Sequence, residues 1–148
     1  MFEGIKQILN NAYKLSETDA WFFVITTREV EEEIIRMNTE DQLEEDGIDS
    51  ENNSLGEYSL RTIIEKIQKG DRHDHVTLKD TGAFYNSFLV AVDRSGFSIV
   101  ADDVAFYDRP LTEVYGIEIL GLTKENTAWL GDFITFQYGK YVRERLLS

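Results

Sequence analysis

The sequence predicts a single α+β domain over residues 1–148, in which an antiparallel β-sheet packs against a long N-terminal helix and a C-terminal helix. Apolar and polar residues alternate over about 88–101, on either side of a turn at Asp93–Gly96, which is the pattern of a central β-hairpin. Apolar residues recur at three- and four-residue steps near both ends of the chain, as in amphipathic helices. The 148 residues are enough to bury a core without covalent staples.

The composition of the chain disfavours several classes of binding partner and site. The formal net charge of −13 disfavours binding to phosphate backbones and to anionic membranes, because both need clustered Lys and Arg. We therefore expect neither sequence-specific nucleic acid nor a membrane as a partner. The absence of cysteine excludes disulfides and thiolate metal sites. The N-terminus lacks a signal-peptide pattern and the longest apolar run, Ala20 to Ile25, is too short to span a bilayer, so we expect a soluble, cytoplasmic protein.

Two helices are expected in the first third of the chain. Residues 2–15 carry apolar side chains at helical spacing. A second helix is predicted from about Asp19 to Glu44, because Val30, Ile34 and Met37 recur at helical steps among glutamates. The alternative for its first part is a strand over 21–26, where aromatic and β-branched residues are dense.

The region at about 40–57 is predicted to be a solvated helix end followed by an acidic loop. Residues 40–53 contain seven acids and no base. A calcium loop beginning at Asp49 is rejected, because Ser54 stands where the sharp-turn glycine is needed and Leu60 where the bidentate glutamate is needed. The turn-rich centre of the loop fits a small ribbon or an ordered loop.

A short helix is expected between Ser59, which can cap its start, and Gly70, which can close its end. The following segment contains His73 and His75, two residues apart. They are the only histidines in the chain, so no third imidazole completes a metal site, and we predict a polar loop.

The stretch with the densest local signals is 76–88, in which a short extended segment is followed by a turn and then by a segment rich in aromatic residues. Asp80 or Thr81 can cap a helical turn, and Gly82 allows close backbone approach. The stretch is predicted to be structural, aiming aromatic side chains and the next strand into the core. Its motif residues are Leu78, Asp80, Thr81, Gly82, Phe84, Tyr85 and Phe88. The hairpin that follows has apolar residues on both faces near its middle, which predicts that both faces are covered.

The C-terminal part predicts a short helix, an extended piece and a long helix. Pro110 suits the first turn of a helix that ends at Tyr115–Gly116. Residues 117–120 could form an edge strand. The last helix begins near Thr123, and its apolar stripe consists of Leu130, Phe133, Ile134, Tyr138, Tyr141 and Val142, with Arg145 at its end.

The sequence contains no credible catalytic or cofactor constellation. No serine lies in a nucleophile elbow, and no glycine-rich phosphate loop or dinucleotide fingerprint occurs. The adjacent acids Asp102 and Asp103 are one pair among 28 acidic residues, so their adjacency alone nominates no hydrolase. We expect no enzyme, no catalytic residue, no cofactor and no metal.

Four blocks of the sequence resemble a family of small structural proteins of tailed bacteriophages and prophages. These blocks are residues 41–50, 55–59, 76–88 and 115–126. The third contains Leu78-Lys79-Asp80-Thr81-Gly82 followed by an aromatic residue and Ser87, a pattern that is similar to virion-morphogenesis and tail-completion proteins. Together the blocks span much of the chain, and their order and spacing are more specific than any one of them.

The resemblance implies a virion component at the neck or tail, acting in head–tail joining or tail completion through protein–protein assembly. It implies portal, neck or tail proteins as partners, a ring homo-oligomer, and residence in the host cytoplasm and then in the virion. The candidate assembly surface is acidic and consists of Glu44, Glu45, Asp46, Asp102 and Asp103. The alternative from another class is an acidic inhibitor or immunity-type protein that masks a basic partner, and a third is an enzyme that uses the acidic cluster.

Overall fold

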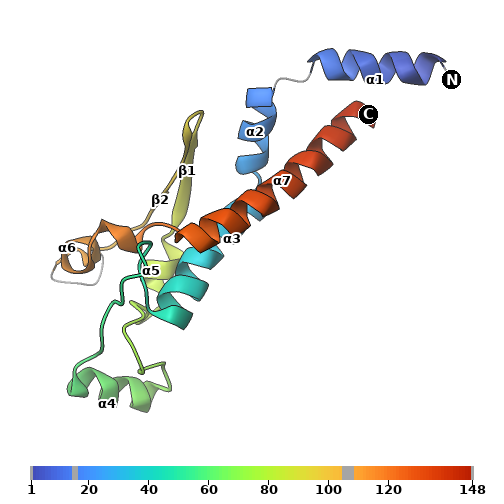
Figure 1. The fold of residues 1–148 in the computed structure, drawn as a ribbon. Coiled ribbons are helices and arrows are strands. Elements are labelled where there is room, and N and C mark those ends of the chain that lie inside the picture. The colour runs from blue at the N-terminus through green and yellow to red at the C-terminus, as the bar shows by residue number, and fades with distance from the viewer. Residues whose placement is uncertain (1, 15–16, 105–108, 148) are drawn as a thin grey trace.

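The computed structural model describes residues 2–14, 17–104 and 109–147. Within them the protein is α+β: helices pack against one face of a two-stranded antiparallel sheet, and the last element is a long helix (Figure 1). The elements are α1 Phe2–Lys14, α2 Glu17–Ile25, α3 Arg28–Arg36, the π-helix η1 Met37–Asp46, α4 Leu60–Lys69, α5 Ala83–Asn86, β1 Leu89–Asp93, β2 Gly96–Val100, α6 Leu111–Tyr115, the 3₁₀ turn η2 Ile117–Ile119 and α7 Lys124–Leu147.

The prediction of a single helix over 19–44 is wrong, because the helix is interrupted between α2 and α3. Thr27 is extended, with ψ of 150°, and stands at the N-cap position of α3. The Thr26 hydroxyl donates to the Phe22 carbonyl at 3.0 Å, and the Thr27 hydroxyl donates to the Val24 carbonyl at 2.7 Å. These hydroxyls satisfy carbonyls at the end of α2, so the helix can stop there. The alternative strand over 21–26 is also wrong, since these residues lie in α2 and the turn.

Helix α3 runs directly into the π-helix η1, which is wider than an α-helix and ends at Asp46, two residues beyond the predicted end at Glu44. It stops at Gly47, whose φ of 61° is left-handed. A Cβ atom at Gly47 would also collide with the ring of His75. The region at about 40–57 therefore begins with a helix end, as predicted, but this end is not fully solvated, since Gln42 and Leu43 are buried. The loop begins at Ile48, which forms a single antiparallel bridge with Ser54.

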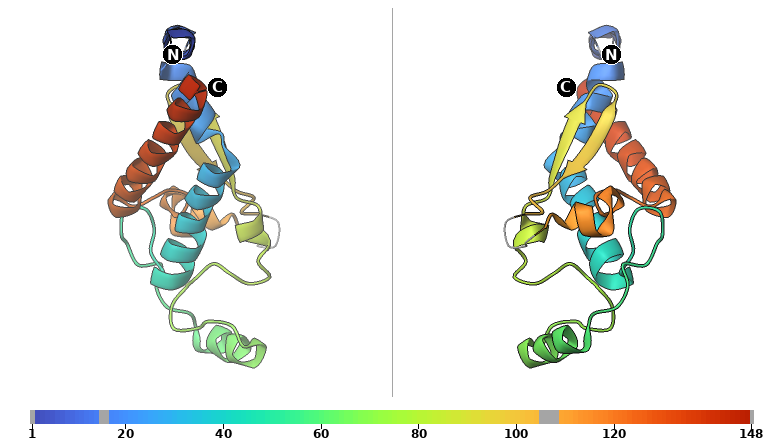
Figure 2. Two further views of the ribbon diagram at one scale, coloured as in Figure 1. Left: turned by 90° about the vertical axis from the view of Figure 1, so that its right-hand side faces the viewer. Right: turned by 90° about the vertical axis from the view of Figure 1, so that its left-hand side faces the viewer.

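The N-terminal helices α1, α2 and α3 all pack against helix α7 (Figure 2). Trp21 of α2 stacks on Tyr138 with ring centroids 4.2 Å apart. Near the end of α7, the Asn11 side chain of α1 donates to the Leu146 carbonyl at 3.1 Å. Leu130 and Ile134 are buried beneath this layer.

The hairpin has the predicted antiparallel pairing, with Leu89 opposite Val100. The prediction that both its faces are covered is wrong. Helices α2 and α3 contact β1, and Val90 and Phe97 pack against the core on that side. On the other side Leu89 is 60% exposed and Val100 is 44% exposed. No element among the described residues covers this outer face, because the sheet has only two strands and its helices lie on one side.

The edge strand considered for 117–120 does not form. Residues 117–119 make a 3₁₀ turn in which Ile119 is fully buried, and the turn follows Gly116, whose φ is 94°. The Glu118 carbonyl accepts from the Ser50 amide at 2.9 Å, so this backbone bonds to the acidic loop and not to the sheet. Helix α6 lies where it was expected, with Pro110 at its N-cap position.

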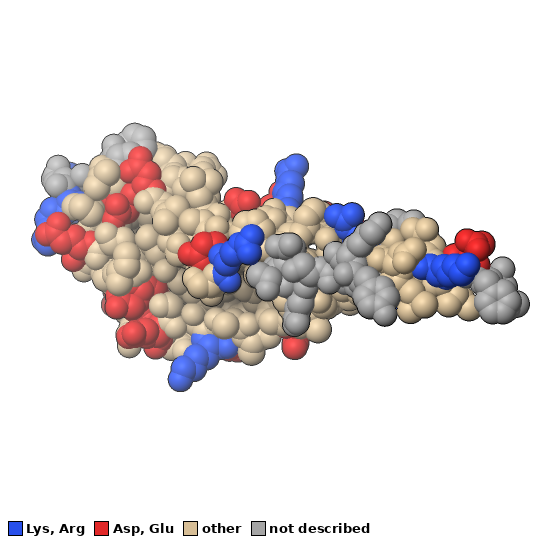
Figure 3. Space-filling model, turned by 90° about the horizontal axis from the view of Figure 1, so that it is seen from above, with Lys and Arg blue, Asp and Glu red and all other residues tan. Residues whose placement is uncertain are grey.

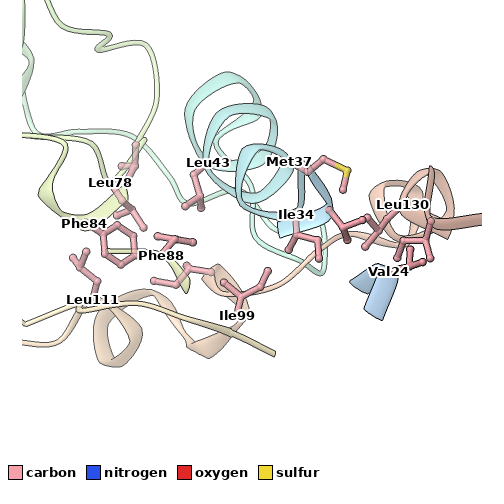
Figure 4. Packing of buried hydrophobic residues seen from close by; sticks show 14 residues of the cluster. Val24, Ile34, Met37, Leu43, Leu78, Phe84, Phe88, Ile99, Leu111 and Leu130 are labelled. Carbon is pink, nitrogen blue, oxygen red and sulfur yellow. The ribbon is translucent and has the colours of Figure 1, made fainter. Parts of the chain in front are cut away.

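The core is elongated and not spherical. Figure 4 shows a row of side chains that runs from Val24 and Leu130, past Ile34 and Ile99, to Phe84 and its neighbours. The row joins α2, α3 and η1 to the hairpin and to the 76–88 stretch, so these elements share one continuous apolar interior, to which the described residues of α1 and α4 contribute no buried residue.

Candidate interaction surface

Helix α4 presents its apolar stripe to solvent. The Ser59 hydroxyl accepts from the Thr62 amide at 3.3 Å at its start, and Gly70 at its end is left-handed, with φ of 76°. Leu60, Ile64 and Ile67 recur at helical steps on one side of the helix. They are 73%, 48% and 54% exposed, respectively. A stripe of this kind normally faces a core, but here nothing in the described part of the chain covers it.

The position of α4 explains this exposure. The helix lies at one extremity of the molecule, at the ends of the connections 47–59 and 70–82 (Figures 1 and 2). The buried residue of α4 is Lys66, whose ammonium donates to the Lys79 carbonyl at 2.8 Å. The inward side of the helix therefore holds Lys66 together with the half-buried Thr62 and Ile63. The stripe of Leu60, Ile64 and Ile67 faces outward, which is unusual for a set of large apolar side chains.

A second set of exposed apolar side chains lies at the opposite extremity, on α1 (Figure 1). Ile5, Ile8 and Leu9 are exposed there at helical spacing. Seen from above, charged side chains form small scattered groups of both signs between larger uncharged areas (Figure 3). Two apolar helix faces, those of α4 and α1, therefore lie at the two ends of an elongated molecule, in addition to the exposed outer face of the hairpin.

The motif stretch 76–88 lies between α4 and the core. Leu78 is buried in the left-handed conformation, with φ of 59°. Asp80 pairs with Lys69 of α4 at 3.2 Å. The Thr81 hydroxyl accepts from the Ala83 amide at 3.2 Å, and Gly82, with φ of 85°, stands at the N-cap position of α5. These contacts form a turn, with no grouping that could perform chemistry.

The aromatic residues of the stretch clamp its backbone. The Thr77 amide donates to the Tyr58 hydroxyl at 2.9 Å, and the Tyr85 hydroxyl donates to the Thr77 carbonyl. Phe84 and Phe88 are buried and meet edge to face, with centroids 5.0 Å apart. The stretch therefore fixes the connection that returns from α4 to the core, and it positions α4 relative to the body.

Replacing Gly82 with valine should lower the free energy of unfolding by about 1–3 kcal/mol, because a β-branched residue is strained at positive φ. The space itself is adequate, since a Cβ atom would lie 3.7 Å from the Asn86 side chain. Urea unfolding measures the loss. Gly131→Ala in α7 is the matched control: it meets nothing within 4 Å and should stabilise the protein by about 0.5–1 kcal/mol. A Gly82→Val variant as stable as the parent would show that the turn is not constrained.

Most of the acids predicted to form an assembly surface have partners within the chain. Glu44 pairs with Lys79 at 2.9 Å, and Glu45 pairs with Arg72 at 2.8 Å.

The aspartates of this set fall into three cases. Asp103 accepts from the amide and hydroxyl of Thr112 at the start of α6, and these hydrogen bonds lower the pKa of its carboxyl. Asp102 accepts from the Val104 amide at 3.2 Å. Asp46 is exposed, and no cation or hydrogen-bond donor of the described chain holds its carboxylate.

The ring nitrogens of both histidines lie within hydrogen-bond distance of backbone carbonyls. One ring nitrogen of His75 lies 2.8 Å from the Glu44 carbonyl, and His73 lies 3.3 Å from the Asp71 carbonyl. Arg72 binds the neighbouring Asp74 and lowers the pKa of that carboxyl to about 2. In the described ranges no three His, Cys, Asp or Glu side chains gather as a metal site would require.

A buried polar connection between η1 and the segment 119–126 was not predicted from the sequence. The Asn38 side chain donates to the Ile119 carbonyl at 2.9 Å and accepts from the Gly121 amide at 2.9 Å. The Gln42 side chain donates to the Gly121 carbonyl at 2.8 Å and accepts from the Thr123 amide at 2.9 Å. We call these two side chains, Asn38 and Gln42, the amide latch. Their four-residue spacing on a helix was the available signal, but Gln42 lies within the acidic run 40–53, which indicated solvent.

No family model, no curated protein and no solved structure matches this chain. In the ranges that the structure describes, none of the helices combines the length and the apolar character needed to cross a membrane.

Proposed function

We propose that this protein is a virion structural protein of a tailed bacteriophage or prophage, which acts in head–tail joining or tail completion by protein–protein contact. The observation that carries the proposal is the apolar stripe of α4, defined by Leu60, Ile64 and Ile67, which faces solvent at one end of the molecule. An amphipathic helix held out in this way is suited to lie in a groove of another protein.

The energetics favour a partner. Burying a leucine or isoleucine side chain contributes about 1.5–3 kcal/mol, so the three residues of the stripe can supply much of the affinity of a moderate interface. The two long connections, 47–59 and 70–82, hold α4 away from the rest of the protein, where a partner can contact it. The resemblance to phage structural proteins supports the same surface, because two of the resembling blocks, 55–59 and 76–88, flank α4 on either side.

A ring of identical subunits fits the positions of the exposed apolar faces. The α4 stripe and the α1 face lie at opposite ends of the molecule (Figure 1). Unlike faces at two ends produce head-to-tail contacts, which close into a ring when the rotation between subunits allows it. The other proposed partners are portal, neck or tail proteins. The protein would reside in the host cytoplasm during assembly and then in the virion, with no catalytic chemistry and no cofactor.

Size-exclusion chromatography with light scattering tests the proposal. The purified chain is measured alone and after co-expression with the proteins encoded by the neighbouring reading frames. We expect a ring-sized oligomer, or incorporation into a larger head or tail complex. A chain that stays monomeric with every such protein would contradict the proposal, and a tight one-to-one complex with a basic protein would favour the inhibitor or immunity-type alternative.

A further inference from the structure

A cavity of about 430 Å³ lies between α4, the extended residues 78–80 and α6. Its wall is amphipathic. Leu78, Leu111, Val114 and the Tyr115 ring contribute apolar surface. The charged members of the wall are Lys66, Lys69, Lys79 and Arg109, with the acids Glu65 and Asp80. A cavity of this size and mixed character is typical of a site for a small group and not of a packing defect.

Lys66 is the unusual member of the wall. The residue is only 8% exposed, although lysine is rarely buried unless a carboxylate accompanies it. Its ammonium lies 2.8 Å from the Lys79 carbonyl and 4.7 Å from the centroid of the Tyr58 ring. The carbonyl accepts one of its three protons, and the ring stabilises the cation through its face. Neither neighbour carries the negative charge that would neutralise a buried ammonium.

The other cations of the wall already have carboxylate partners. Lys69 pairs with Asp80 at 3.2 Å, and Lys79 pairs with Glu44 at 2.9 Å. Arg109 pairs with Glu113 at 2.8 Å. Within the described residues, no Asp or Glu lies within ion-pair distance of Lys66. This chain carries 28 acids and 15 Lys and Arg residues, so a buried lysine without an acid is not explained by a shortage of carboxylates.

The apolar wall lies next to this charge. Burial, with a smaller effect of nearby Tyr58, raises the pKa of the Tyr115 hydroxyl, so the ring stays neutral. Leu111 is buried and Val114 is exposed at the mouth. A group that fills this space therefore meets a neutral aromatic and aliphatic surface and the ammonium of Lys66, because the other charged side chains of the wall are already in ion pairs.

We propose that the cavity binds a carboxylate carried on an apolar or aromatic group, with the Lys66 ammonium as its counter-ion and the α6 side chains packing on the apolar part. The carboxylate belongs either to a small organic acid or to the C-terminus of a protein segment that ends in an apolar residue. The chemistry at Lys66 is the same for both. This inference does not depend on the virion role, because it uses the inner side of α4 and not its exposed stripe.

Binding of 3-phenylpropanoate to the full chain, followed by NMR titration, tests the proposal. We expect saturable binding that weakens with salt, and no comparable binding of 3-phenylpropanamide, which lacks the charge. Lys66→Met keeps the apolar stem and should weaken binding about tenfold to a hundredfold, as for loss of a charge-assisted hydrogen bond. Lys124→Met, at an exposed lysine of α7 outside the cavity wall, should change it by less than about threefold.

Thermal melting separates binding from structure. If Lys66 is retained for a ligand, the Lys66→Met variant should melt at or above the temperature of the parent, because an uncompensated buried charge has been removed. A lower melting temperature with unchanged binding would assign Lys66 a structural role and overturn the proposal. Val114→Trp supplies a second test, since a larger ring at the mouth should block the cavity while the residue stays exposed in the free protein.

A peptide arm distinguishes the two sources of carboxylate. A short peptide that ends in phenylalanine is compared with the same peptide carrying a C-terminal amide. Binding of the free-acid peptide more tightly than 3-phenylpropanoate would identify a protein C-terminus as the ligand, and the reverse order would identify a small acid. If neither acid binds up to its solubility limit, or if both bind Lys66→Met as well as the parent, the proposal is wrong.

Discussion

Replacing Gln42 with leucine is expected to lower the free energy of unfolding by about 2–5 kcal/mol, the largest stability effect of any single substitution considered for this protein. Leucine fits the volume but cannot hydrogen-bond, so the Gly121 carbonyl and the Thr123 amide lose their partner. Thr123 is buried, so water does not readily replace the lost bond. A domain of this length is stabilised by about 5–15 kcal/mol, and the loss is a large fraction of that.

Urea unfolding measures this effect, and two further variants control it. Asn38→Leu removes the other half of the amide latch and should be comparably destabilising, with the double variant less than additive because both side chains hold the same segment. Glu40→Gln changes an exposed residue on the same helix and should leave the urea midpoint unchanged within about 0.5 kcal/mol. A Gln42→Leu protein as stable as the parent would show that the latch does not hold the C-terminal segment.

The double variant Ile64→Glu with Ile67→Glu is expected to weaken assembly at least about thirtyfold, because it replaces two apolar contacts of the α4 stripe by carboxylates. Both side chains are exposed in the free chain, so the melting temperature of the unassembled protein should not fall. Sedimentation velocity of the chain with its assembly partners, together with a thermal melt of the free chain, measures the two quantities.

Arg61→Glu is the matched control for net charge, since it makes the chain more acidic by the same two units from an exposed position on α4. It should assemble as the parent does, apart from a modest dependence on salt. Equal loss in Arg61→Glu and in the double variant would indicate that general repulsion, and not the apolar stripe, governs association. Normal assembly of the double variant would show that α4 is not part of the contact.

Local sequence signals predicted the elements whose cause is local. The Asp93–Gly96 turn with its alternating flanks corresponds to β1 and β2, and the stripe from Leu130 to Val142 lies in α7. The interruption at Thr26 and Thr27 escaped prediction because two hydroxyls compete for helix carbonyls there, while the apolar spacing continues through the break.

The periodicity of the sequence could not predict which apolar helix and sheet faces are buried within this chain. A stripe such as that of α4 predicts that an apolar face is buried, but it does not say whether the burying surface belongs to the same chain. The outer face of the hairpin, with Leu89 and Val100, presents the same difficulty. The amide latch was missed for a related reason: Asn38 and Gln42 are buried by a segment some 80 residues away, and no local pattern records that contact.

Thiol labelling tests whether the α4 stripe is a contact surface in an assembled particle. The chain has no cysteine, so Ile64→Cys introduces a single reactive site, and Glu40→Cys provides an exposed reference on η1. In the free chain both thiols should react with a maleimide at similar rates. In the assembled ring or particle, we predict that the thiol at position 64 becomes protected while the thiol at position 40 stays reactive. Equal and undiminished labelling of both positions in the assembled state would contradict the claim.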